Sequence, residues 1–213
     1  GSVDVFNDYD NVALGKLMLG ETRANNVIAY KSPTLVGVPV TFMAAAVLSE
    51  EDKDADVANT DIDEGANGYS ASLAYDQNGV YLAAGYDNNI QSSKTDSAWR
   101  LAGSVDMGKM NMVPGLTLGA LYQETDVADK SDDEKSWLVS GKYKIGATPW
   151  AVKAQYIDTS NQSGVKDRDA QEIALGAEYT INKATKGHLY AAQIDTDNVS
   201  DKTIVGGGLE YKF

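Results

Sequence analysis

The residues that could carry catalytic chemistry are few, and they are poorly matched to one another. Histidine occurs once, at position 188, and cysteine is absent. A nucleophilic triad needs a base beside its serine, and a zinc site needs several His or Cys ligands. The serines and aspartates of this chain occur without such a partner. We therefore expect no enzyme, no catalytic residue, no metal site and no cofactor, and we interpret His188 as a rim residue.

Charge itself is the remaining chemistry of the chain. Thirty-one acidic residues stand against 18 basic ones, which gives a formal net charge of −13. A nucleic-acid partner is therefore excluded, because phosphate binding needs clustered Lys and Arg. The stretch from Ser49 to Asn67 alone holds eight carboxylates and one lysine. We interpret it as a solvated loop. A divalent-cation site is the alternative, although the spacing does not match an EF-hand loop.

One unit recurs along the chain: a stretch in which apolar and polar residues alternate, followed by a polar gap. Helical periodicity is nearly absent. Regular strands separated by turn residues predict an all-β fold, and Asn78-Gly79 is a strong signal for a two-residue hairpin. We predict eleven strands: Asn25–Ser32, Val40–Leu48, Gly68–Asp76, Val80–Asp87, Ala98–Met107, Leu116–Glu124, Lys135–Ile145, Trp150–Asp158, Gln171–Ile181, His188–Asp195 and Thr203–Phe213.

The polar gaps alternate between short and long, which is typical of an antiparallel up-and-down arrangement. Short turns then lie at one end of the strands and long loops at the other. One connection, Gly108–Gly115, is longer than the others at the short-turn end. The gaps interpreted as long loops are Ser49–Asn67, Asn88–Ser97, Thr125–Glu134, Thr159–Ala170 and Thr196–Lys202.

Each predicted strand has one apolar face and one polar or small face. In Lys135–Ile145, for example, Val139 and Tyr143 share a face, while Ser140 and Lys142 share the other. A soluble β-sandwich would bury the apolar face against a second sheet. A transmembrane barrel would instead turn it towards lipid.

The aromatic residues favour the membrane interpretation. They lie near the ends of the apolar faces and leave small aliphatic residues in the middle, as two belts at the lipid headgroups would. Phe213, the terminal residue, needs no protein cover at such a depth. The expected belts are Tyr69, Tyr86, Trp99, Tyr122, Trp137 and Tyr156 at the long-loop end, and Tyr30, Tyr75, Tyr143, Trp150, Tyr179, Tyr211 and Phe213 at the short-turn end.

Three stretches resemble the trimeric, sixteen-stranded general diffusion porins of the Gram-negative outer membrane. The ending GGGLEYKF resembles the final strand of that family, and VDVFNDYDN (Val3–Asn11) resembles the acidic tip of its inward-folded third loop. GETRANNVIAYKSP (Gly20–Pro33) resembles the strand after that loop. The resemblance implies an antiparallel up-and-down transmembrane β-barrel, of which this chain holds about eleven strands. We expect the first five strands to be missing.

What the resemblance implies for the site is a pore constriction. Residues 1–22 would fold into the lumen, and residues 23–213 would form the wall strands. The loop would supply Asp4, Asp8 and Asp10, and the wall would supply Arg23, which matches the family's arginine, with Lys31 on the same face. The weaker lumen candidates are Arg100, Lys142 and Lys153.

The resemblance also implies partners and a location. It predicts a homotrimer in the outer membrane of a Gram-negative bacterium, in contact with lipid and lipopolysaccharide. The terminal Phe213 strand would be read by the outer-membrane assembly machinery. The expected function is passive diffusion of ions and small hydrophilic solutes through a water-filled channel.

Three other functions remain open at this point. A substrate-selective porin could use the lysines at 31, 142 and 153 to select anions, whereas only Tyr81 is a clear lumen-facing aromatic for a sugar track. A surface β-sandwich for adhesion or recognition would be soluble without detergent. A barrel-embedded enzyme would need the catalytic geometry that the chain lacks.

Overall fold

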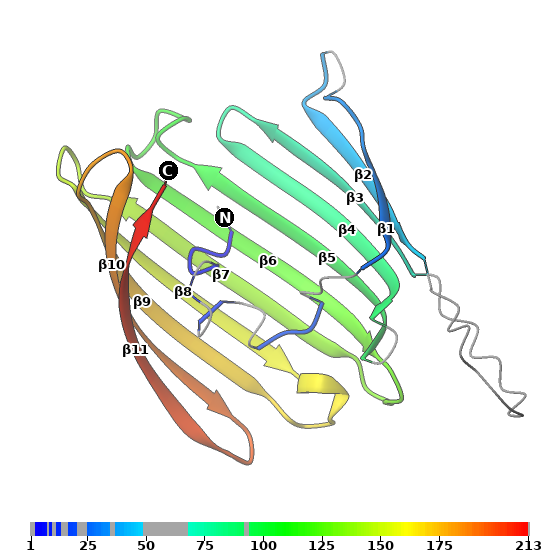
Figure 1. The fold of residues 1–213 in the computed structure, drawn as a ribbon. Coiled ribbons are helices and arrows are strands. Elements are labelled where there is room, and N and C mark those ends of the chain that lie inside the picture. The colour runs from blue at the N-terminus through cyan, green and yellow to red at the C-terminus, as the bar shows by residue number, and fades with distance from the viewer. Residues whose placement is uncertain are drawn as a thin grey trace, which may run out of the picture.

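The fold is a single curved sheet (Figure 1). The computed structural model describes residues 3–7, 9, 12–13, 17–20, 25–34, 37–48, 68–91 and 94–212. The strands are β1 (Val27–Lys31), β2 (Val40–Val47), β3 (Gly68–Gln77), β4 (Val80–Gln91), β5 (Thr95–Asp106), β6 (Leu116–Val127), β7 (Glu134–Lys144), β8 (Trp150–Ser160), β9 (Ala170–Thr180), β10 (Thr185–Thr196) and β11 (Val199–Tyr211), with a 3-10 turn, η2 (Gln162–Gly164).

Every strand pairs antiparallel with its neighbours in sequence, so the spatial order follows the chain from β1 to β11. The predicted all-β, up-and-down arrangement of eleven strands is confirmed. Such a sheet pairs most backbone N–H and C=O groups of its inner strands. No helix within the described ranges is long and apolar enough to span a membrane.

Several strands extend further into the polar stretches than the alternation predicts. Asn88–Ser97 and Thr196–Lys202 were predicted as long loops, and both predictions are wrong. β4 continues to Gln91 and β5 begins at Thr95, while Asp197-Asn198 alone joins β10 to β11. Asn198 adopts a φ of 60°, which asparagine tolerates in a tight hairpin turn. The hydrogen bonds between strands continue where both faces are polar. The hydropathy pattern therefore does not indicate a strand there.

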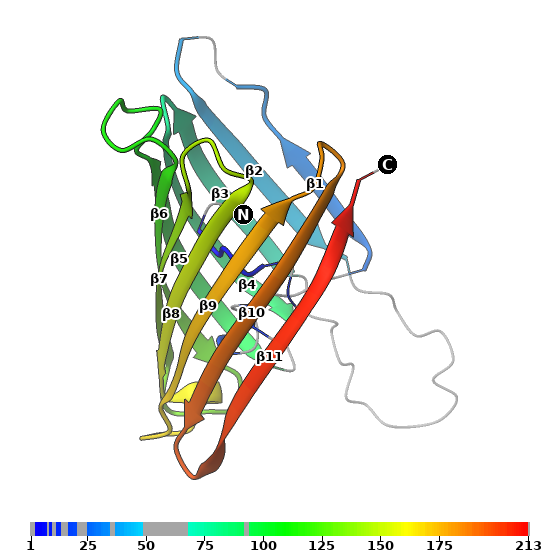
Figure 2. The same ribbon diagram turned by 90° about the vertical axis from the view of Figure 1, so that its left-hand side faces the viewer.

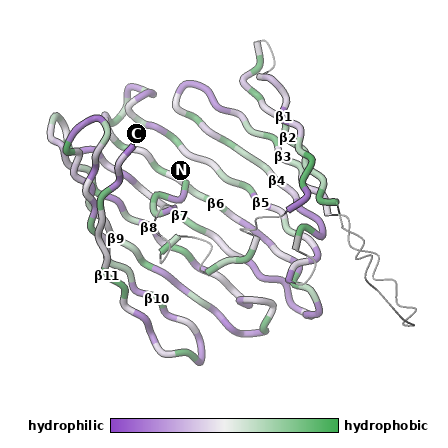
Figure 3. The backbone as a smooth tube through the Cα atoms, in the orientation of Figure 1, coloured by the Kyte–Doolittle hydropathy of each residue, from purple (hydrophilic) through white to green (hydrophobic). Residues whose placement is uncertain are grey.

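The two faces of the sheet have different surroundings. Hydropathy changes from residue to residue along the strands instead of in long blocks (Figure 3). Val139, Leu175 and Leu209 lie on the convex face and are 45%, 58% and 73% exposed. A β-sandwich would bury all three, and the described residues form one sheet only. The sandwich interpretation is therefore wrong.

The N-terminal segment, the described residues between Val3 and Gly20, lies on the concave side of the sheet (Figure 2). Most of the buried apolar residues pack where this segment contacts the strands. They form two small clusters that join this segment to β6–β11. Leu138 and Ile157, which share the face predicted to be polar or small, are fully covered there. The clusters are Leu17, Met18, Leu121, Leu138, Ile157 and Ala170, and Phe6, Tyr9, Val12, Ala174, Ala192 and Ile204.

The β3–β4 turn allows a test of local packing. Gly79 and Gly37 share a φ of +83°, but a Cβ on Gly79 would lie 2.8 Å from Lys109 Cβ and 2.9 Å from the Asp106 carbonyl oxygen. A Cβ on Gly37 meets no described atom within 4 Å. Gly79→Ala and Gly37→Ala should each cost about 1–2 kcal/mol of backbone strain, and Gly79→Ala should lose a further ~1–3 kcal/mol to overpacking.

Denaturant unfolding in lipid vesicles measures both variants against the parent. Gly37→Ala is the control, because it carries the same backbone strain without the close contact. Equal unfolding free energies for the two variants would contradict the packing described for this turn.

Candidate functional site

The N-terminal segment, by which we mean the described residues between Val3 and Gly20, runs along the concave side of the sheet (Figure 1). Its backbone is folded into short turns. The Asp4 Oδ1 atom accepts the Phe6 N–H at 2.9 Å, and the Tyr9 N–H donates to the Phe6 carbonyl at 2.8 Å. These local bonds satisfy polar backbone groups that would otherwise be buried unpaired. With its backbone folded in this way, the segment packs side chains such as Phe6 and Tyr9 against the sheet.

The first attachment of the segment is made by Lys153 of β8. Its ammonium donates to the Val5 carbonyl at 2.8 Å and to the Tyr9 hydroxyl at 2.9 Å. It also lies 2.9 Å from Glu178 Oε1, while Lys142 Nζ lies 2.5 Å from Glu178 Oε2. The Lys153 side chain is only 4% exposed. A buried ammonium is tolerated because it is both paired and fully hydrogen-bonded.

Aromatic packing supports the same attachment. The Tyr9 ring stacks on His188 and Tyr190 of β10, with centroid distances of 4.4 Å and 4.9 Å. Glycines make room for these rings: a Cβ on Gly206 would lie 2.4 Å from Tyr190, and one on Gly176 would lie 2.8 Å from the Phe6 ring. His188, which we expected at the rim, thus lies on the concave face beneath the segment.

The second attachment holds the segment at Leu17–Leu19. Glu134 of β7 is buried, and its carboxylate accepts the Leu19 N–H at 2.7 Å and the Ser163 N–H at 2.8 Å. Gln123 Nε2 donates to the Leu19 carbonyl at 2.6 Å. One carboxylate thereby joins the segment to η2, in the loop between β8 and β9. Sequence reasoning missed Glu134, because nothing local links it to residues more than a hundred positions away.

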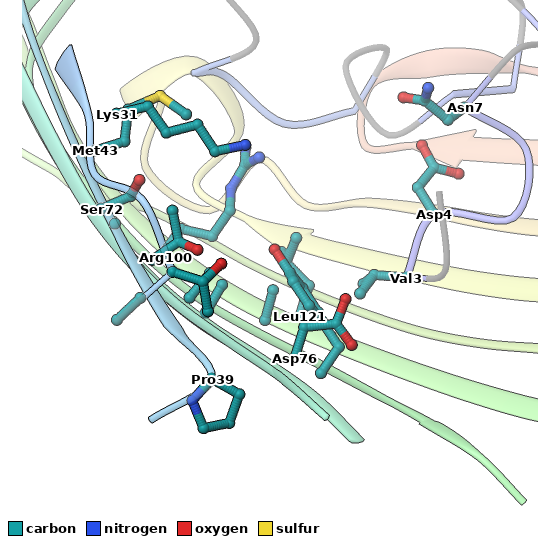
Figure 4. A pocket seen from close by; sticks show the side chains of 18 residues that line it. Val3, Asp4, Asn7, Lys31, Pro39, Met43, Ser72, Asp76, Arg100 and Leu121 are labelled. Atoms are coloured by element: carbon teal, nitrogen blue, oxygen red, sulfur yellow. The ribbon is translucent and has the colours of Figure 1, made fainter. Parts of the chain in front are cut away.

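A cavity of about 840 Å³ lies between the segment and the wall formed by β1–β6. Lys31 and Arg100 project into it from the sheet, and Asp4 and Asn7 project from the segment on the opposite side (Figure 4). The Arg100 Nε atom donates to Gln123 Oε1 at 2.7 Å, which fixes the guanidinium against the wall. Asp76 of β3 also lines the wall, so two cations and one carboxylate of the wall face Asp4 across an open space.

The structure brings together only part of the predicted constriction. Asp8, Asp10 and Arg23 lie outside the described residues. Those that are described divide into two groups. Asp4, Lys31 and Arg100 line the cavity, as does Tyr81, whereas Lys142 and Lys153 pair with Glu178 beside the segment.

The aromatic residues of the convex face lie in rows across the strands. Trp99 and Tyr122 have ring centroids 5.2 Å apart, and Trp137 and Tyr156 lie 5.1 Å apart. At the other end of the strands, Trp150 and Tyr179 lie 4.8 Å apart. Phe213 is outside the described residues. Rings thus lie at both ends of these strands, and their role as two belts at the lipid headgroups stays a prediction.

Comparison with known proteins identifies the relatives of this chain. A family model described as Gram-negative porin matches residues 1–199. A search of curated proteins found no match.

Solved structures of similar fold include an OmpT loop-deletion mutant, an outer membrane protein of Vibrio cholerae. It is 16% identical with a TM-score of 0.59, and the match covers 87% of this chain and 62% of that one. A porin refined at 1.8 Å is 17% identical, with a TM-score of 0.61 and coverages of 92% and 65%. OmpF of Salmonella typhi in complex with daunomycin is 16% identical, with a TM-score of 0.67 and coverages of 98% and 70%.

These identities show a shared fold and nothing further. The chain spans less than two thirds of the length of the first two structures.

The attachment at Glu134 predicts a local effect on backbone protection. In Glu134→Gln the amide nitrogen replaces one acceptor, so the Leu19 or Ser163 N–H loses its partner. A buried unsatisfied donor costs about 1–3 kcal/mol, so hydrogen exchange at that amide should accelerate roughly 5- to 150-fold. Exchange followed by mass spectrometry on peptides covering residues 17–20 and 161–165 measures this change.

Glu124→Gln is the matched control. Glu124 is also a strand carboxylate near the same end of the sheet, but it pairs with the half-exposed Lys135 at 3.2 Å. Such exposed pairs contribute little, so exchange in the two peptides should not change. Unchanged exchange in Glu134→Gln as well would show that this carboxylate does not hold the segment.

Proposed function

Because the chain belongs to the Gram-negative porin family, we propose that it forms the wall and the constriction of a water-filled channel. The channel admits ions and small hydrophilic solutes by passive diffusion. Membership of this family places the chain in the outer membrane of a Gram-negative bacterium. The family suggests a non-enzymatic channel, and passive diffusion requires no catalytic group.

The observation that carries the proposal is the cavity between the segment and the β1–β6 wall, with a volume of about 840 Å³. It is bordered by Lys31, Arg100 and Asp76 on the wall side and by Asp4 on the segment side. Opposed charges create a transverse field, which orients polar solutes and discriminates between ions. The segment does not fill the concave side, so water and small solutes have room to pass beside it.

We assign residues 1–22 to the inward-folded constriction loop and residues 23–213 to the wall strands. The contacts of Val5, Tyr9 and Leu19 with the concave face support this assignment. Asp8, Asp10 and Arg23 are proposed as further members of the constriction, from the resemblance of their motifs alone. The convex rings are proposed to lie at the two lipid interfaces.

A homotrimer is proposed as the assembled state. Support comes from the fold neighbours, among which a trimer form of the OmpT protein of Vibrio cholerae is described. Contacts with lipid and lipopolysaccharide are proposed for the exposed apolar convex face. Recognition of the final strand by the assembly machinery is proposed from the sequence of its end.

The anion-selective alternative has less support than the sequence suggested. It depended on lysines at 31, 142 and 153, and two of these share the carboxylate of Glu178. A sugar track also has little support, because Tyr81 is the one aromatic residue among the described residues that line the cavity, and Tyr190 is covered by Tyr9.

Ion selectivity tests the constriction directly. The full-length protein should give stepwise conductance in planar bilayers. Lys31→Gln removes one cation from the cavity wall, and a unit charge ~8 Å from the ion path acts with about 0.5 kcal/mol in water. This charge acts on K⁺ and Cl⁻ with opposite signs, so its removal changes the energy difference between them by about 1 kcal/mol. The permeability ratio of K⁺ to Cl⁻ should therefore rise roughly fivefold, measured as a reversal potential in a KCl gradient at low ionic strength.

Lys166→Gln provides the control, since Lys166 is an exposed residue of the β8–β9 loop and does not line the cavity. It removes the same charge from a different place and should leave the ratio close to that of the parent. A parent protein that inserts into bilayers without conducting ions would refute the channel.

The lipid-facing side of the wall gives a second test. Leu175→Arg places a cation on the convex face, where the cost at the bilayer midplane is about 2–4 kcal/mol. Ala83→Arg places the same residue on the concave face, beside the cavity, where water can solvate it. Unfolding free energies measured in vesicles should differ between the variants by about that amount, and equal values would contradict a lipid-facing convex side.

A further inference from the structure

We propose that Lys153 is the positioning residue of the constriction: it holds the N-terminal segment at a fixed distance from the cavity wall. This inference rests on the proposed channel function. The position of Lys153 on the polar face suggests a cation that is exposed to passing ions. The proposal instead gives Lys153 a structural role, which is to hold the segment.

The hydrogen bonds of Lys153 carry the first step. A lysine ammonium has three N–H donors, and three acceptors surround it: the Val5 carbonyl at 2.8 Å, the Tyr9 hydroxyl at 2.9 Å and Glu178 Oε1 at 2.9 Å. Its nitrogen also lies 4.2 Å from the centroid of the Tyr9 ring and 4.9 Å from that of Phe6. Every donor is occupied, so none remains for a solute.

The second step is the place of Val5 in the segment. Val3, Asp4 and Asn7, its close neighbours in sequence, line the cavity. Figure 4 shows Val3, Asp4 and Asn7 together on the segment side, across from Lys31 and Arg100. A displacement of the Val5 backbone therefore moves the wall that carries Asp4, and with it the width and the field of the passage.

The third step is the contrast with Lys142, the cross-strand partner of Lys153 in the β7–β8 register. Both ammonium groups bind Glu178, one at each carboxylate oxygen. The Lys142 side chain is 36% exposed, and within the described part of the chain its polar contact is Glu178 alone. The two lysines thus share a charge environment, and only Lys153 contacts the segment.

The experiment compares Lys153→Met with Lys142→Met in the full-length protein in planar bilayers. Each variant removes one positive charge from the same ion cluster. Lys153→Met also removes two charge-assisted hydrogen bonds to the segment, which should raise the population of displaced segment conformations roughly tenfold or more. While the displaced conformations are rare, the variance of the open-channel current is proportional to their population. The variance should therefore rise by about the same factor.

Lys142→Met should leave the current variance close to the parent value, because the segment keeps its contacts. A charge effect alone would change the reversal potential in both variants and the variance in neither. Equal variance in Lys153→Met and Lys142→Met would therefore overturn the proposal.

A milder variant keeps the proposal testable if Lys153→Met fails to fold. Tyr9→Phe removes only the hydroxyl acceptor and retains the stacked ring. It should raise the variance in the same direction by a smaller factor, and a variance equal to that of the parent would count against the proposal. The channel function is tested separately, because a parent protein that does not conduct refutes the proposed function. A parent that conducts, with variants whose current variance equals that of the parent, refutes only this inference.

Discussion

The period of two along each strand is the constraint on which the rest of the structure depends. Successive side chains of a strand point to opposite faces, and this sheet has a single layer, so each strand must satisfy two different surroundings at once. A slip of one residue in register would exchange the faces. Cross-strand pairs on the convex face show how closely the register is fitted: Leu82 lies over Gly103 and Leu189 over Gly207.

The concave face meets the opposite demand, because its polar groups must be kept either in water or in complete hydrogen bonds. The segment covers part of this face. The charged groups that attach it are paired, whereas both carboxylate oxygens of the buried Glu172 lack a hydrogen bond. Lys153 and Lys142 share Glu178, while Glu134 receives two backbone N–H groups. Burying such charges unpaired would be strongly unfavourable. The segment is consequently held by a few directional bonds and two small apolar clusters, and the remaining space stays open as the cavity.

Most of the fold could be predicted from the sequence, since an alternating pattern with turn residues depends only on neighbouring positions. The ends of the strands were harder to predict. The polar Asp197-Asn198 hairpin carries no hydropathy signal, so the strands beside it were predicted too short. Residues that line the cavity could be placed by the alternation of the two faces along a strand (their parity), as Lys31 and Arg100 were.

The attachments of the segment could not be predicted, because they depend on tertiary contacts between residues far apart in the chain. Parity placed Lys153 on the polar face, but whether its ammonium meets water or the Val5 carbonyl depends on the path of the segment. His188 was expected at the rim for the same reason, since its stacking on Tyr9 has no local signature. Glu134 resembled any other loop carboxylate until its bonds to Leu19 and Ser163 were visible.

The central claim is that the two faces of the wall meet different solvents, and accessibility along one strand tests it most directly. The chain has no cysteine, so single cysteines at residues 81–86 of β4 would each carry one nitroxide in the full-length protein in vesicles. Dissolved oxygen should relax the labels at 82, 84 and 86, and a water-soluble nickel chelate should relax those at 81, 83 and 85. Equal accessibility at all six positions would contradict the account. So would the reverse alternation, with oxygen relaxing the labels at 81, 83 and 85 and the nickel chelate relaxing those at 82, 84 and 86.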